Sequence, residues 1–335
     1  MRVEMFSAFL GSLASLVFLI AVGYGCRKLR LLDDKLNAGL TALLVKVTLP
    51  CTVFQSLMRP FSRQLLGESA LTFVLSAGVF LCGGLAGAAL AKLMKAAPGE
   101  RRVWQFALIF ANVGYMGFPV SQAVFGDEGL IYTSMANAAF NLLAFTVGIR
   151  LFNPAGGAAP EGSAKSESGA ITAGEPRAEG KPGKINSFRM IISSPALIAT
   201  LAGFILFVTG LRLPQPVHTG MSMLGGMTTP VSMMLVGSIL AKNRLRSLFT
   251  DLRTVPVIVF RLAVIPLAAF FILRLIVGNP TMLGVIIALS AMPVASLTVI
   301  FAEQYKGDTA LASRLVALST LCCVVTVPLI SLLLF

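Results

Sequence analysis

Residues 111–122, ANVGYMGFPVSQ, lie in a run apolar enough to cross a membrane, yet this stretch contains Asn112, Gly114, Gly117 and Pro119. Glycine permits backbone dihedrals that other residues avoid, and proline removes a backbone donor. In lipid every backbone polar group needs a partner within the protein, so an unwound segment survives only where it packs against protein or lines a cavity. The stretch therefore predicts a broken membrane helix beside a cavity.

The composition around this stretch is that of an all-α polytopic membrane protein. Of the 335 residues, 56% are hydrophobic and 12% are charged, and the mean hydropathy is +0.86. A hydrocarbon core of roughly 30 Å is crossed by about 20 apolar residues. Ten such spans are predicted, at 6–26, 37–58, 69–92, 103–126, 129–151, 188–210, 217–241, 254–277, 281–304 and 310–334.

The net charge of +13 follows the predicted topology. Of the 27 basic residues, 19 fall in the loops after the odd-numbered spans, five on the other side and three within spans. The positive-inside rule then makes the odd loops cytoplasmic and places both termini outside. Because the charges are spread through short loops rather than gathered with aromatic residues, nucleic acid is not expected as a partner.

Residues 152–187 are rich in Gly, Ala, Pro, Ser, Glu and Lys and are predicted to form a disordered cytoplasmic loop. This loop divides the chain into 1–151 and 188–335, with five spans each. An odd number of spans makes the two halves inverted repeats if they are related.

A weak internal repeat supports that relation. The sequence G-D-x-x-L occurs at 126–130 and again at 307–311. Counting back 15 residues from each Asp reaches Asn112 in one half and Pro293 in the other, so the two broken stretches occupy the same place in their repeats. Two broken helices at corresponding positions of inverted halves indicate a transporter's binding site, where half-helix N-termini favour an anion. The alternative is that these prolines and glycines merely kink membrane helices.

Four polar residues lie deep in apolar spans. Asn112 is predicted either to contact the substrate or to cap a half-helix, and the two roles are compatible. Asn141, and more weakly Asn137, either faces the substrate or makes an interhelical hydrogen bond. Lys46 either attracts an anion or pairs with a backbone carbonyl. The predicted substrate site therefore comprises Asn112, Gly114, Gly117, Pro119, Asn141, Pro293 and Lys46.

The remaining chemistry-bearing residues indicate no enzyme, metal site or cofactor. The five cysteines lie in or beside apolar spans without metal-ligand spacing, and His218 lacks a catalytic motif. Asp127 and Asp308 would lie on opposite faces of the membrane, so they could not act as a proteolytic pair. Arg261 is expected to snorkel or to pair structurally. Gly83 and Gly87 form a GxxxG motif that permits close helix approach, within the chain or in a homodimer.

Four stretches resemble the auxin efflux carrier family, to which plant auxin exporters and bacterial malate and malonate permeases belong. They are NVGYMGFPVSQAVFGDEGL (112–130), LTALLVKVTLPCTVF (40–54), TTPVSMMLVGSILA (228–241) and the sequence from 290 to 330. The resemblance implies two inverted five-helix repeats similar to bile acid symporters and sodium/proton antiporters, with helices 4 and 9 crossing in mid-membrane. It further implies a scaffold of spans 1, 2, 6 and 7, a moving transport domain of spans 3–5 and 8–10, and location in a bacterial inner membrane.

These observations predict a secondary carrier of small organic anions, mono- or dicarboxylates, that works by elevator-type alternating access. No GxxxxGK[ST] motif for ATP is present. Glu303 is the only acidic residue within a predicted span, so uncoupled export of a monoanion is expected. A sodium- or proton-coupled symporter is the alternative, and a channel is a further rival.

Overall fold

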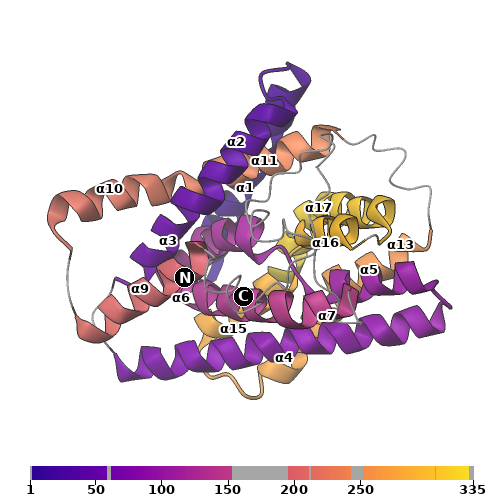
Figure 1. Cartoon of the computed structure of the whole chain (residues 1–335). Coiled ribbons are helices and arrows are strands. Elements are labelled where there is room, and N and C mark those ends of the chain that lie inside the picture. Colours follow the sequence, from indigo (N-terminus) through magenta and orange to yellow (C-terminus); the bar gives the residue numbers. More distant parts are fainter. Residues whose placement is uncertain are drawn as a thin grey trace, which may run out of the picture.

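The computed structural model describes residues 2–58, 62–152, 195–210, 213–242, 252–305 and 307–331, and every regular element among them is a helix (Figure 1). The helices of the first half are α1 (Arg2–Lys28), α2 (Asp34–Leu43), α3 (Leu49–Ser56), α4 (Arg63–Leu93), α5 (Pro98–Ile109), α6 (Phe118–Leu143) and α7 (Ile149–Phe152). Those of the second half are α9 (Pro195–Thr209), α10 (Gln215–Gly226), α11 (Thr228–Lys242), α13 (Thr254–Val259), α14 (Ile265–Leu273), α15 (Pro280–Ser290), α16 (Leu297–Gln304) and α17 (Thr309–Ser331).

Six stretches of the described chain are long and apolar enough to cross a membrane: Asp34–Ser56, Arg63–Leu93, Val113–Phe152, Gln215–Ala241, Thr254–Leu273 and Thr309–Ile330. The prediction of an all-α membrane protein is confirmed at this level. The count of ten spans and their inverted relation stay predictions. Pro280–Ser290 is too short to span by itself, because the chain leaves the helix after Ser290 and re-enters one at Leu297.

Three widened, π-helical turns each end directly before an X-Pro pair. They are η1 (Leu44–Thr48), η2 (Val113–Gly117) and η5 (Phe260–Val264), followed by Pro50, Pro119 and Pro266. A proline cannot bond to the carbonyl four residues earlier, and its ring pushes that carbonyl away, so the preceding turn expands. A fourth such turn, η3 (Ala144–Gly148), has no proline after it.

Prolines therefore do not always break the helix. A Thr-x-Pro sequence occurs in the second predicted span of each half, at Thr48-Leu49-Pro50 and at Thr228-Thr229-Pro230, and predicts a break in each. In the first half, however, helix runs unbroken from Asp34 to Ser56, with η1 as its only irregularity. The corresponding Thr228-Thr229-Pro230 does follow an interruption, at Met227 between α10 and α11.

Two predicted boundaries change in the first half. The fourth and fifth predicted spans are joined through α6, whose only non-helical residue is Gly126 with φ 62° and ψ −153°. A side chain is strained at this positive φ, which explains the glycine. Phe152, predicted to begin the disordered loop, instead ends α7 and is buried among aromatic rings, stacked on Phe301 and Tyr305. The rest of the predicted loop, 153–187, lies outside the described residues.

Close packing of glycines fixes two helix pairs. On α1 and α11, a Cβ at Gly23 would overlap the carbonyl of Met234, and one at Gly237 would overlap that of Ile20. On α4, a Cβ at Gly83 would overlap the carbonyl of Leu108 in α5, and one at Gly87 would lie 2.9 Å from the Gln105 Cα. The GxxxG motif thus packs within the chain, against α5.

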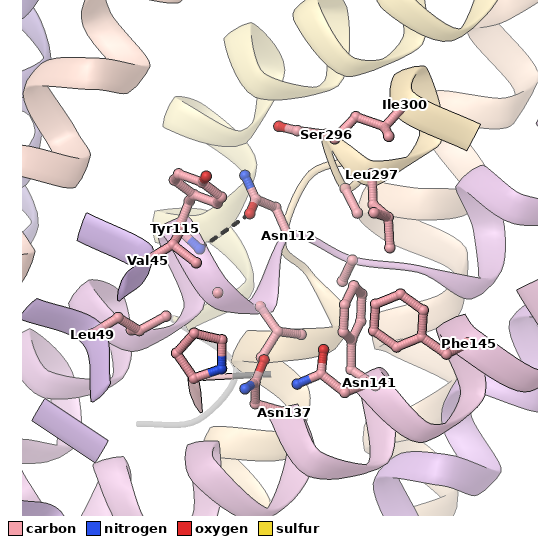
Figure 2. A pocket seen from close by; sticks show the side chains of 16 residues that line it. Val45, Leu49, Asn112, Tyr115, Asn137, Asn141, Phe145, Ser296, Leu297 and Ile300 are labelled. Atoms are coloured by element: carbon pink, nitrogen blue, oxygen red, sulfur yellow. Dashed lines mark hydrogen bonds between the residues drawn. The ribbon is translucent and has the colours of Figure 1, made fainter. Parts of the chain in front are cut away.

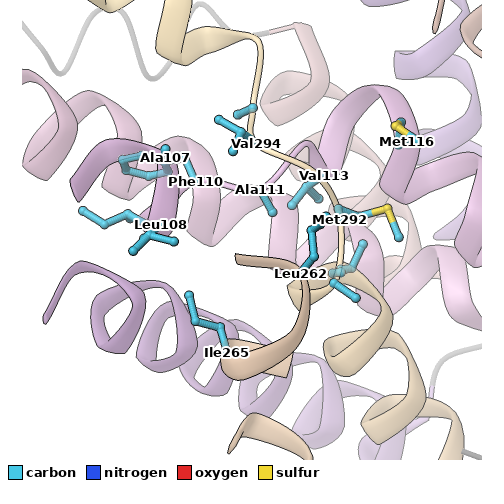
Figure 3. Packing of buried hydrophobic residues seen from close by; sticks show 14 of the residues in the cluster. Ala107, Leu108, Phe110, Ala111, Val113, Met116, Leu262, Ile265, Met292 and Val294 are labelled. Carbon is cyan, nitrogen blue, oxygen red and sulfur yellow. The ribbon is translucent and has the colours of Figure 1, made fainter. Parts of the chain in front are cut away.

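The largest apolar core surrounds the two breaks. Side chains of α5, of η5 and α14, and of residues 291–295 pack together there, and Figure 3 shows Leu108, Phe110, Leu262, Met292 and Val294 in this cluster. Phe110, Met292 and Val294 are completely buried. The unwound segments therefore lie inside protein, as backbone without regular structure must in a membrane.

Candidate functional site

The two breaks meet as a short antiparallel bridge between Ala111 and Val294. The backbone N–H of Asn112 donates to the Pro293 carbonyl (2.8 Å), and the backbone N–H of Ala295 donates to the Phe110 carbonyl (3.0 Å). Each unwound segment thus supplies hydrogen-bond partners that the other has lost, which is what makes irregular backbone tolerable at this depth. Pro293 lacks an N–H and takes part through its carbonyl alone.

Asn112 caps the half-helix that follows it. Its Oδ1 accepts a hydrogen bond from the Tyr115 amide (3.2 Å), so the capping role is confirmed. The side chain is nine-tenths buried, and its Nδ2 has no hydrogen-bond partner in the described part of the chain. One end of the amide therefore holds the helix, and the other end is available to a ligand.

A pocket of about 120 Å³ lies beside the bridge. Figure 2 shows the side chains around it, which come from η1 and α3, from η2, α6 and η3, from the start of α9 and from the start of α16. The residues that line it are Val45, Leu49, Ala111, Asn112, Val113, Gly114, Tyr115, Asn137, Phe140, Asn141, Phe145, Pro195, Ala295, Ser296, Leu297 and Ile300.

Two helical segments, η2 and α16, begin at this pocket, so their N-termini border it. The backbone N–H groups of Gly114, Ser296 and Leu297 have no acceptor among the described residues, because they belong to the first positions of η2 and α16 or directly precede them. The positive end of each helix dipole therefore points toward the same small space.

Asn137 and Asn141 lie one turn apart on α6, and Figure 2 shows their side chains next to each other beneath Asn112. Asn137 is only 5% exposed. Neither amide makes a hydrogen bond to any described residue, so the expected interhelical bond is not seen. Both amides line the pocket without a partner in the described chain, so they are available to hydrogen-bond a ligand there.

The structure brings together three of the predicted site residues, Asn112, Gly114 and Asn141. Gly117 faces α15 instead, where a Cβ would lie 2.6 Å from Leu289 Cδ2. Pro119 and Pro293 shape the breaks and do not line the pocket.

Lys46 is separate from this group. It lies on η1, its side chain is exposed, and it does not line the pocket, although its neighbour Val45 does. Its attraction for an anion stays a prediction.

The aromatic residues Tyr115, Phe140 and Phe145 and the hydroxyl-bearing Ser296 also line the pocket and are not among the predicted site residues. The sequence could have indicated Ser296, because it comes shortly after Pro293 in the second break, as Gly114 comes shortly after Asn112 in the first. The spacing of Asn137 and Asn141, four residues apart, also signals one polar helix face in an apolar span.

Arg261 lies on the N-terminal side of the two breaks, where α5 and α15 end, and its side chain connects these two helix ends. This completely buried residue of η5 donates from Nε to the Met292 carbonyl (3.1 Å), from Nη1 to Leu108 (2.9 Å) and from Nη2 to Ser290 (3.0 Å). These carbonyls belong to the C-terminal ends of α5 and α15, where helix dipoles are negative. Arg261 therefore pairs structurally with backbone carbonyls and does not snorkel.

A second polar cluster lies around Tyr132, near the middle of α6. Glu68 of α4 accepts hydrogen bonds from the Tyr132 hydroxyl (2.6 Å) and from Asn279 Nδ2 (3.0 Å). Because α4 begins at Arg63, Glu68 lies within a helical span, and Glu303 is not the only such acid. Among the described residues, no group of three or more His, Cys, Asp or Glu side chains could hold a metal ion.

Comparison with known proteins identifies the family. The family model described as "Membrane transport protein" matches residues 8–331, which is nearly the whole chain. The chain belongs to this membrane transport family. Its membership confirms the resemblance to auxin efflux carriers, and the protein is an integral membrane protein of a transporter family.

Relatives in this transport family cover almost the same length. An uncharacterized transporter of Methanothermobacter thermautotrophicus is 26% identical over 329 residues, which are 96% of this chain and 98% of the relative. An uncharacterized transporter of Escherichia coli K12 is 22% identical over 332 residues, 97% of each chain. One of Methanocaldococcus jannaschii is 24% identical over 316 residues, 91% of this chain and 92% of the relative.

Proposed function

We propose that this transport-family protein carries small organic anions, specifically carboxylates, and binds them where the two breaks meet. The observation that carries the proposal is the set of donors without partners at one pocket. Backbone N–H groups from two helix N-termini face it, together with the Nδ2 of Asn112 and the buried amide of Asn137.

This set of donors suits a carboxylate for two reasons. Helix N-termini favour negative charge through both their free N–H groups and their dipoles. Hydrogen bonds to an ionised acceptor are also about twice as strong as neutral ones. The asparagine side chains supply donors without a fixed positive charge, so the bound anion need not be held too tightly to be released.

We further propose elevator-type alternating access. In this mechanism α1–α3 and α9–α11 form the scaffold, and α4–α7 and α13–α17 move. Val45, Leu49 and Pro195 of the proposed scaffold line the pocket together with residues of the proposed moving part. A substrate held between the two parts would change its surroundings when one slides against the other.

We also propose that the protein exports its substrate without a coupling ion, driven by the membrane potential. A coupling cation held by carbonyls at the breaks is the alternative. Against it, the carbonyls of Leu108, Ser290 and Met292 already accept from Arg261, and those of Phe110 and Pro293 accept from backbone amides. We place the protein in a bacterial inner membrane with both termini outside, in a monomer or a homodimer.

Counterflow tests the proposed function. The purified protein is reconstituted in proteoliposomes loaded with one unlabelled carboxylate, and uptake of the same labelled carboxylate is followed. A carrier shows a transient overshoot that saturates with substrate concentration, whereas a channel shows equilibration without overshoot. Failure of every mono- and dicarboxylate in a broad panel to give counterflow would reject the proposal.

A further inference from the structure

We propose that the turn between α4 and α5 binds the headgroups of anionic phospholipids at the membrane surface. This inference goes beyond the proposed function, because it uses the membrane span of α4 and not the identity of the substrate. It rests on the way basic, acidic and apolar side chains are placed around this turn.

The length of α4 brings this turn to the level of lipid headgroups. The helix Arg63–Leu93 has 31 residues, which at 1.5 Å per residue extend over roughly 46 Å. A hydrocarbon core is roughly 30 Å thick, and a bilayer with its headgroup layers about 40–45 Å. The helix is therefore long enough to carry the turn after Leu93 into a headgroup layer.

Basic side chains predominate in and beside this turn. Five of them stand against one acidic side chain: Lys92, Lys95, Arg101, Arg102 and Arg253 against Glu100. Glu100 is already engaged, since it accepts from Nη1 of Arg253 (3.2 Å) and from the backbone N–H of Ala97 (3.1 Å). Lys92, Lys95 and Arg101 are exposed. Such a cluster directly after a membrane helix is typical of a surface that binds anionic headgroups.

Lys95 has a backbone conformation that favours glycine. Its φ is 48°, and the turn is a Schellman motif, in which the Ala96 N–H bonds to the Ala91 carbonyl (2.9 Å) and the Lys95 N–H to the Lys92 carbonyl (3.2 Å). Glycine is unstrained at such a position, whereas lysine is not. The negative end of the helix dipole already has a basic partner in Lys92. A ligand for the ammonium group explains a lysine here better than the fold does.

Two leucines project beside these charges. Leu93 is 81% exposed, and Leu252, which precedes Arg253, is 79% exposed. Arg253 connects the two segments, because its Nη2 donates to the Met94 carbonyl (3.3 Å). A phospholipid offers acyl chains to the leucines and a phosphate to the basic groups, whereas a soluble anion offers only the charge. The combination therefore favours a lipid as the ligand.

The end of α1 provides a matched comparison. Arg30 follows this helix in the same kind of turn, with φ 61°. Here, however, the acidic residues Asp33 and Asp34 come next, and Asp34 pairs with Arg27 (2.7 Å). These acids offset the basic charge, so we expect weaker lipid binding at this end.

The melting temperature of the detergent-purified protein tests the inference, because a ligand that binds only the folded state raises it. The protein is titrated with phosphatidylglycerol, with phosphatidylcholine of the same acyl chains, and with soluble glycerol phosphate. We expect phosphatidylglycerol to act at concentrations at least about tenfold lower than phosphatidylcholine, and glycerol phosphate to have no effect at those concentrations. Equal effects of the two lipids, or the full effect with glycerol phosphate alone, would overturn the inference.

Three variants locate the surface. Lys95→Gly removes one charge and the strained side chain, so the lipid-free protein should melt no lower than the wild type, while its affinity for phosphatidylglycerol should fall about fivefold. Lys95→Arg retains the charge and should retain the affinity. Arg30→Gly makes the same backbone change after α1 and should leave the affinity nearly unchanged. An unchanged affinity in Lys95→Gly, or equal losses in Lys95→Gly and Arg30→Gly, would contradict lipid binding at the turn between α4 and α5.

Discussion

The backbone N–H of Asn112 and the backbone carbonyl of Pro293 are joined by a 2.8 Å hydrogen bond, although the two residues belong to opposite halves of the chain. With the reciprocal bond from Ala295 to Phe110, this pairing makes each break depend on the other. A change on one side of the bridge should therefore affect binding groups that come from both halves.

Replacement of Asn112 separates its two roles. Asn112→Asp keeps an oxygen that can cap η2, so thermal stability should stay near that of the wild type. The added negative charge should repel an anion and lower carboxylate uptake by at least about tenfold. Uptake is compared at matched protein levels in the membrane. Unchanged uptake in Asn112→Asp would remove this residue from the site.

Asn137 should show a conflict between stability and binding. Asn137 is only 5% exposed, and its amide lines the pocket without a hydrogen-bond partner among the described residues, so Asn137→Leu replaces a poorly hydrated polar group with an apolar one. We expect the ligand-free protein to become more stable by on the order of 1 kcal/mol, while carboxylate affinity falls. Thermal unfolding with and without ligand measures both effects. A destabilised variant would indicate that the amide has a structural partner instead.

Arg261 should be required for folding of the region where the two breaks meet. Arg261→Met leaves three buried carbonyls without their donor and should destabilise the protein by about 3 kcal/mol or more. Arg261→Lys retains the charge but cannot reach three carbonyls at once, so an intermediate loss is expected. Arg274→Met changes an exposed arginine and serves as the control. If Arg261→Met and Arg274→Met had equal stability, the buried guanidinium would not stabilise the region where the two breaks meet.

The bond from Thr229 Oγ1 to Gln122 Oε1 (3.1 Å) links α11 to α6, and thus the proposed scaffold to the proposed moving part. Thr229→Val removes this bond, which is worth about 1 kcal/mol. We expect the equilibrium between transport states, and hence the maximal rate, to change by about fivefold, with little change in stability. Thr146→Val is the control, because Thr146 bonds only to its own helix. Equal rates for the two variants would argue against movement at this contact.

The sequence predicts the positions of both breaks because glycine, proline and asparagine are unusual in apolar spans, and because both breaks lie at the same distance from a G-D pair. It does not predict the partners of Arg261. A long side chain reaches carbonyls that are remote in sequence, and hydropathy says nothing about its direction. Lys46 illustrates the same limit, since it lies within a helix as predicted but its side chain is exposed and outside the pocket. The widened turns before Pro50, Pro119 and Pro266 follow from proline sterics and were accessible from sequence.

Uncoupled transport and the proposed binding site are both tested by carboxylate flux in proteoliposomes that contain this protein alone, under an imposed membrane potential and without sodium or proton gradients. We expect saturable movement of a labelled monocarboxylate that follows the potential, which supplies about 2.3 kcal/mol per charge per 100 mV. We expect this movement to be lost in Asn112→Asp. Concentrative uptake that requires a sodium or proton gradient would contradict uncoupled transport. Flux that is unaffected by Asn112→Asp would contradict a binding site at the meeting of the two breaks.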